Sequence, residues 1–111
     1  MKISALSSTL GYTTVQQEYQ DRDLQDGYTS DLLSDVMANA AEGSVLITIQ
    51  AHKNAVAVSS MAGIAAIVIC NSRPIPDDMI EAAGSERIAL FVTEKNQFTV
   101  SAEVYGRLTA E

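Results

Sequence analysis

Hydrophobic and polar positions along this chain fall into short blocks whose spacing switches between that of a helix and that of a strand. The clearest helical block holds five apolar residues on one face: Leu32, Leu33, Val36, Met37 and Ala40. Ser30, just before this block, is a candidate N-cap. The pattern predicts helices over 2–10, 31–41, 54–62, 77–83 and 97–108, strands over 12–16, 45–50, 65–70 and 88–92, and a short strand over 27–30.

Strands that alternate with helices are typical of parallel β-α-β units. The block 65–70 is apolar at every position, as expected of a central strand covered on both faces. The 19 positions from 54 to 72 carry no charge, but Gly63 divides them into a helix-like and a strand-like half, which argues against a membrane span. We therefore predict one α/β domain over residues 1–111, a sandwich with a central mainly parallel β-sheet flanked by helices.

Charge and cysteine content narrow the functional classes. The 111 residues include 14 acidic and 7 basic side chains, a net charge of −7, which argues against a nucleic-acid partner. A single cysteine, Cys70, excludes an internal disulfide, and no signal peptide is visible at the N-terminus. These features predict a cytoplasmic protein that does not enter a membrane.

No pattern for nucleotide hydrolysis, dinucleotide binding or a metal site stands out. The phosphate-loop and G-x-G-x-x-G motifs are absent, and His52 with Cys70 is too small a set for zinc. Asp31 and Asp35 lie four apart, which fits a shared metal or, more simply, a solvated helix face. A triad of Ser30, His52 and Asp31 has no supporting spacing. We predict no cofactor, no metal and no catalysis.

One cluster of polar residues follows the predicted strands and forms a candidate ligand site. In open parallel sheets, ligands bind outside the carboxyl ends of the strands. Arg73 and Lys95, after the next two strands, carry charges suited to a carboxylate or phosphate. The alternative is that these are ordinary loop residues. The predicted ligand-binding residues are Ser30, Asp31, Thr48, Gln50, His52 and Asn54.

Nearly the whole chain resembles the DRTGG domain family, which is similar to the N-terminal domain of HPr kinase/phosphorylase. The resemblance is strongest over 27–40, where Ser-Asp-Leu-Leu-Ser-Asp-Val-Met at 30–37 is the most specific part; 47–58, 65–69 and the helix start at Pro76-Asp77 extend the match. The resemblance implies an α/β sandwich with a regulatory or ligand-sensing role and carries no catalytic residue set. The naming motif is incomplete, because Asp26 stands where a glycine would let backbone N–H groups approach an anion.

Together these observations predict a stand-alone, non-catalytic regulatory domain that binds a small metabolite or nucleotide at the C-terminal edge of its sheet. The alternative is an interaction module that docks on a metabolic enzyme and has no ligand of its own. A short chain that is 47% apolar also favours a homodimer. The candidate contacts are Val36, Met37 and Met61, or the helix around Val104 and Tyr105.

Overall fold

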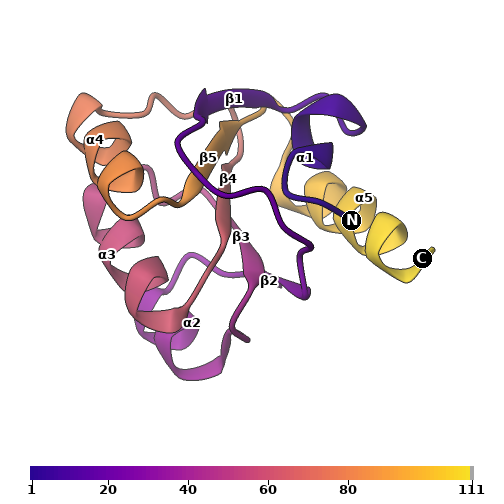
Figure 1. The fold of residues 1–111 in the computed structure, drawn as a ribbon, viewed down its shortest axis with the longest axis horizontal. Coiled ribbons are helices and arrows are strands. Elements are labelled where there is room, and N and C mark those ends of the chain that lie inside the picture. The colour runs from indigo at the N-terminus through magenta and orange to yellow at the C-terminus, as the bar shows by residue number, and fades with distance from the viewer. Residues whose placement is uncertain (111) are drawn as a thin grey trace.

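A computed structural model describes residues 1–110 and contains one five-stranded sheet with helices on both faces (Figure 1). The strand order is β1-β5-β4-β3-β2. The elements are α1 (Ala5–Ser8), β1 (Thr13–Gln16), β2 (Asp26–Thr29), α2 (Leu33–Asn39), β3 (Ser44–Thr48), α3 (Lys53–Ala62), β4 (Ala66–Ile69), α4 (Asp77–Ser85), β5 (Ala89–Val92) and α5 (Gln97–Thr109). The predicted fold class, an α/β domain with a mainly parallel sheet, is confirmed.

Four of the strands are parallel, and their order determines which loops lie at the same edge of the sheet. β2, β3, β4 and β5 pair in parallel in that sequence, so their carboxyl ends share one edge of the sheet. β1 pairs with β5 in the antiparallel direction. The N-terminal segment therefore reaches the same edge as the loops that follow β4 and β5.

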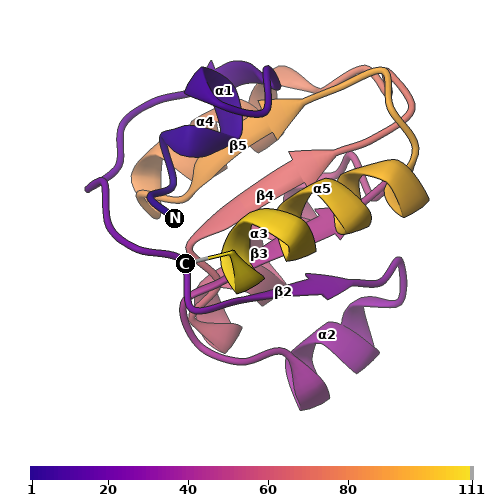
Figure 2. The same cartoon turned by 90° about the vertical axis from the view of Figure 1, so that its right-hand side faces the viewer.

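The helices divide between the two faces of the sheet according to their place in the chain (Figures 1 and 2). α2, α3 and α4, which connect successive parallel strands, pack on one face around Leu46 and Ile67. α1 and α5 pack on the other face around Val68 and Phe91. Because both faces are covered, Ile67, Val68 and Ile69 are fully buried, as their unbroken apolar pattern predicts.

Several element ends differ from the prediction. The helix predicted over 2–10 shrinks to the four residues of α1, and α2 begins at Leu33 rather than at residue 31. Ser30 is not the N-cap of α2: Leu32 holds that position, and the Ser30 hydroxyl accepts a hydrogen bond from the Leu32 N–H at 3.2 Å in a tight turn. Gly63, with φ +76°, ends α3 as expected.

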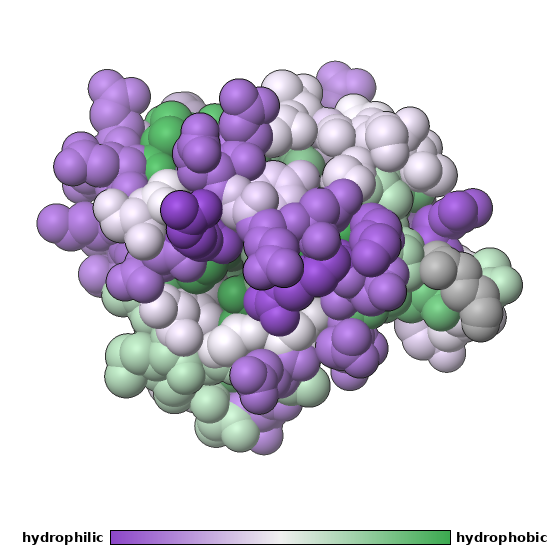
Figure 3. All heavy atoms as spheres, in the orientation of Figure 1, coloured by the Kyte–Doolittle hydropathy of each residue, from purple (hydrophilic) through white to green (hydrophobic). Residues whose placement is uncertain are grey.

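The surface at the amino ends of the parallel strands is strongly polar. Figure 3 shows hydrophilic residues in a band there, where the segment between β1 and β2 passes between the two helical layers. A bridge between Lys2 and Asp23 holds this segment to the N-terminus. Within residues 1–110, every helix is too short or too polar to cross a lipid bilayer.

Candidate functional site

The loops after β2 and β3 are tied together by one carboxylate. Asp31 Oδ1 accepts hydrogen bonds from Thr48 Oγ1, the Ile49 N–H and Gln97 Nε2, each at 2.9 Å. The side-chain amide of Gln50 donates a hydrogen bond to the backbone carbonyl oxygen of Asp31 at 2.8 Å. These contacts, which we call the Asp31 cluster, join β2, β3 and the first turn of α5. The carboxylate therefore anchors the carboxyl edge of the sheet.

The structure brings four of the six predicted site residues together. Ser30, Asp31, Thr48 and Gln50 lie in or beside the Asp31 cluster, and Thr48 is fully buried. His52 and Asn54 are exposed at the start of α3, where His52 Nδ1 accepts a hydrogen bond from the Asn54 N–H at 3.0 Å. Among residues 1–110, no hydrogen bond joins this pair to the Asp31 cluster.

Sequence reasoning missed Gln97, the third donor to Asp31. Its amide comes from α5, 66 residues further along the chain. A glutamine at the start of a helix is an ordinary residue in an ordinary place, so no local pattern marks it. Only the packing of α5 against β2 brings its side chain to Asp31.

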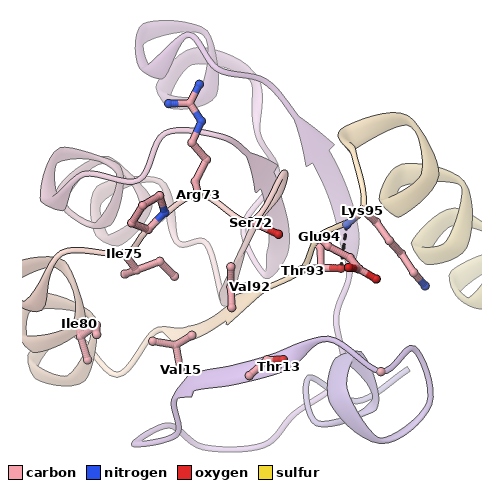
Figure 4. Close-up of a pocket in the computed structure, with 12 residues that line it drawn as sticks. Thr13, Val15, Ser72, Arg73, Ile75, Ile80, Val92, Thr93, Glu94 and Lys95 are labelled. Carbon is pink, nitrogen blue, oxygen red and sulfur yellow. Dashed lines mark hydrogen bonds between the residues drawn. The ribbon is translucent and has the colours of Figure 1, made fainter.

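A pocket of about 570 Å³ lies at the other half of the same edge, between β1, β5 and the loop before α4 (Figure 4). Figure 4 shows Val15 and Thr13 on β1 facing Val92, with Ile75 and Ile80 closing one side. Its aliphatic lining is Val15, Ile75, Ile80 and Val92. Its polar lining is Thr13, Ser72, Arg73, Thr93, Glu94 and Lys95. Sequence reasoning reached Arg73 and Lys95 but not the wall contributed by β1.

The loop that forms one wall of this pocket has an uncommon backbone. Asn71 and Ser72 adopt φ +62° and +51°, a left-handed conformation that non-glycine residues rarely take. The Asn71 N–H donates to the Lys95 carbonyl at 3.0 Å and the Ser72 N–H to the Thr93 carbonyl at 2.9 Å. The loop is thus fastened to the end of β5, and the wall of the pocket is preformed.

Only one of the two predicted cations is free to meet an anion. Lys95 Nζ lies 2.9 Å from Glu103 Oε2 on α5, and the Tyr12 hydroxyl donates to Glu103 Oε1 at 2.8 Å. The hydrogen bond from Lys95 lowers the pKa of the Glu103 carboxyl, and burial raises that of the Tyr12 hydroxyl. Arg73 lies at the rim of the pocket, where Figure 4 shows its side chain extending away from the aliphatic lining; it is exposed and forms no ion pair within the described chain.

The remaining candidates for chemistry are the lone cysteine and the side chains that could bind a metal ion. Burial raises the pKa of the Cys70 thiol to about 11, so it stays protonated near neutral pH. Within residues 1–110, no three His, Cys, Asp or Glu side chains gather as a metal ion requires.

Comparison with known proteins gives a match in fold. No family model and no curated protein matches the chain. The fold is similar to a solved structure of the CBS and DRTGG domains from the regulatory region of Clostridium perfringens pyrophosphatase, complexed with the activator diadenosine tetraphosphate. The TM-score is 0.71 at 13% identity, over 90% of this chain and 44% of that chain. The two proteins thus share a fold over nearly all of this chain and less than half of the other.

Proposed function

We propose that this chain is a non-catalytic regulatory domain of the DRTGG type, which binds a small anionic metabolite, a nucleotide in the first instance. The ligand site is the pocket between β1, β5 and the loop before α4. One observation carries the proposal: four aliphatic side chains and the exposed Arg73 line a preformed pocket at the carboxyl edge of a parallel sheet. Ligands of open α/β sheets bind at this edge.

The chemistry of the lining suits a molecule with a flat apolar part and an anionic group. A base fits between aliphatic side chains such as Val15 and Ile80, while hydroxyls of Thr13 and Thr93 offer hydrogen bonds. The Arg73 guanidinium forms paired hydrogen bonds with a phosphate or carboxylate. Because Lys95 is already paired with Glu103, Arg73 carries the anion contact.

Two further facts support this reading. The C. perfringens region of similar fold binds a nucleotide activator, although that region includes CBS domains as well as a DRTGG domain. The buried and protonated Cys70 argues against nucleophilic catalysis. A lone free cysteine also suits the reducing cytoplasm.

Calorimetric titration with AMP, ATP, diadenosine tetraphosphate and inorganic phosphate tests the proposal. We expect at least one nucleotide to bind, and Arg73→Ala to weaken its binding at least about tenfold because a charge-assisted pair is lost. Arg22→Ala, which removes an exposed arginine outside the pocket, is the matched control and leaves the affinity unchanged. If none of the nucleotides binds, the nucleotide class is wrong.

A double variant separates the pocket from the site predicted by sequence. Gln50→Ala with His52→Ala changes that site without touching the pocket lining. If binding is tenfold weaker in this double variant but unchanged in Arg73→Ala, the ligand site lies at the loops after β2 and β3 and not in the pocket.

We also propose that the domain forms a homodimer. Of the apolar contacts predicted for it, Val36 and Val104 are buried in the protein's own core, while Met37, Met61 and Tyr105 are 37%, 76% and 70% exposed. Exposed side chains of this size also favour the second candidate function, a module that docks on a metabolic enzyme. That alternative would be supported if the protein bound none of the titrated small molecules but formed a stable complex with a metabolic enzyme.

A further inference from the structure

A second pocket, of about 280 Å³, lies at the amino ends of the parallel strands β4 and β5, on the edge of the sheet opposite the pocket beside β1. Its lining comes from the segment between β1 and β2 and from the turn between α4 and β5, which lie near each other in Figure 1. The buried Ile3 and Ala65 supply its apolar part. Its polar lining is Gln20, Arg22, Glu86 and Arg87, and we call it the amino-edge pocket.

The amino-edge pocket concentrates positive charge in an acidic protein. The chain has four arginines, and two of them, Arg22 and Arg87, line this pocket. Neither guanidinium forms an ion pair within residues 1–110, although acidic side chains outnumber basic ones by 14 to 7. Glu86 is the one carboxylate in the lining, and it accepts a hydrogen bond from Ser60 Oγ on α3 at 3.1 Å. The pocket therefore carries two unpaired positive charges and one carboxylate that already has a partner.

The backbone that carries Arg22 is fastened to the N-terminal segment. The Ile3 N–H donates to the Arg22 carbonyl oxygen at 2.9 Å. In the preceding residue, the Asp21 carboxylate accepts hydrogen bonds from the Ser4 N–H at 3.0 Å and from the Ser4 hydroxyl at 2.6 Å. This side of the pocket is thus in place before a ligand binds.

Arg87 occupies a position at which helices commonly have glycine. The Ile88 N–H donates to the Ala83 carbonyl at 2.9 Å and the Arg87 N–H to the Gly84 carbonyl at 3.2 Å, the pair of bonds that closes a helix through a left-handed residue. That residue is Arg87, with φ +55°. Because glycine takes this conformation without a steric penalty, an arginine here lowers the stability of the fold. Strain at an exposed residue indicates a function for its side chain.

We propose that the amino-edge pocket binds a phosphate group between Arg22 and Arg87, either as the free ion or at the end of a small phosphomonoester. Two guanidinium groups offer paired N–H donors to the oxygens of a phosphate, and their charges balance its charge near neutral pH. The Gln20 side-chain amide supplies a further donor. This second site is distinct from the nucleotide site proposed above, because the two pockets share no lining residue.

NMR titration of ¹⁵N-labelled protein with inorganic phosphate, at constant ionic strength, tests the site. We expect the Nε–H signals of Arg22 and Arg87 to shift together, with a dissociation constant on the order of 1 mM because both guanidiniums are exposed to water. Glycerol 3-phosphate distinguishes the two sources of the phosphate group: tighter binding identifies a phosphomonoester, and equal or weaker binding identifies the free ion. Acetate, which has a single charge, should bind at least about tenfold more weakly than phosphate.

Arg87→Gly separates a binding role from a structural one. Phosphate binding should weaken at least about tenfold, whereas the melting temperature should not fall, because glycine relieves the left-handed strain. Glu86→Gln removes the carboxylate from the lining and should strengthen phosphate binding at least about twofold. Arg107→Ala, which removes an exposed arginine outside the pocket, is the matched control and leaves the phosphate affinity unchanged.

Arg22→Ala distinguishes the amino-edge pocket from the nucleotide pocket. It should weaken phosphate binding at least about tenfold, while nucleotide affinity measured well below 1 mM ligand stays the same, since the amino-edge pocket is then nearly empty. The proposal is overturned if about 20 mM phosphate shifts neither arginine signal, if acetate binds as tightly as phosphate, or if Arg87→Gly retains the wild-type affinity. None of these three results changes the prediction that Arg73→Ala weakens nucleotide binding.

Discussion

Removal of the Asp31 carboxylate should destabilise the fold more than removal of an ordinary surface charge. In Asp31→Ala, three donors lose their common acceptor: Thr48 Oγ1, the Ile49 N–H and Gln97 Nε2. Thr48 is fully buried, so water does not easily replace the lost partner there, whereas Gln97 is half-exposed and regains some hydration. A hydrogen bond to a charged group contributes ~1.5–3 kcal/mol, and a stranded buried donor costs ~1–3 kcal/mol.

We expect Asp31→Ala to lower the free energy of unfolding by about 2–4 kcal/mol, after allowance for rehydration of the exposed donors. At ~4 °C per kcal/mol for a domain of this size, the melting temperature falls by roughly 8–16 °C. Asp31→Asn keeps an oxygen at the same place and should lose only about 1 kcal/mol. Urea unfolding followed by circular dichroism measures both variants.

Asp23→Ala is the matched control, because Asp23 is exposed and its ion pair with Lys2 is long at 3.8 Å. Its removal should change stability by less than about 0.5 kcal/mol. If Asp31→Ala unfolds within that same margin of the wild type, the Asp31 cluster does not hold the edge of the sheet together, and the argument from buried donors is wrong.

Three more variants test other parts of the structure. Glu103→Gln should cost ~1 kcal/mol at pH 7. Because the pKa of Glu103 is lowered in the folded state, the gap between wild type and variant should close as pH falls through that pKa in urea melts; a gap that widens would contradict the pairing with Lys95. Ser59→Ala should raise the free energy of unfolding by ~0.5–1 kcal/mol, because the buried Ser59 hydroxyl has no hydrogen-bond partner within the described chain. A lower melting temperature in this variant would show that the hydroxyl does have a partner. Gly63→Ala should cost ~1–2 kcal/mol in the same melts, since φ is +76° and a Cβ would lie 2.7 Å from Glu42 Cγ, whereas an unchanged melt would show that the turn adapts.

The alternation of strands and helices could be predicted because each buried element leaves a local mark. A strand covered on both faces must be apolar throughout, and 65–70 shows this in the sequence, as the burial of β4 confirms. Gly63 marks the end of α3 because the left-handed turn there excludes most side chains. Element ends were less certain, since Ser30 binds the Leu32 N–H in a turn instead of capping α2.

Only part of the candidate site could be predicted from the sequence. Consecutive parallel strands place their ends together, so the proximity of Asp31 and Thr48 follows from the β-α-β rhythm alone. Gln97 and Val15 follow no such rule, because they reach the carboxyl edge from a helix and a strand far along the chain.

What the sequence determined by itself is the class of fold and the gathering of the carboxyl ends of the parallel strands at one edge, because both follow from local periodicity. Which residues share that edge was decided only by tertiary structure. The N-terminal strand β1 pairs with β5, which builds one wall of the pocket opposite Val92. The packing of α5 brings Glu103 to Lys95, so that one of the two cations at this edge is held in an ion pair. Contacts between residues distant in sequence are set by the shape of the whole core, and no local pattern encodes them.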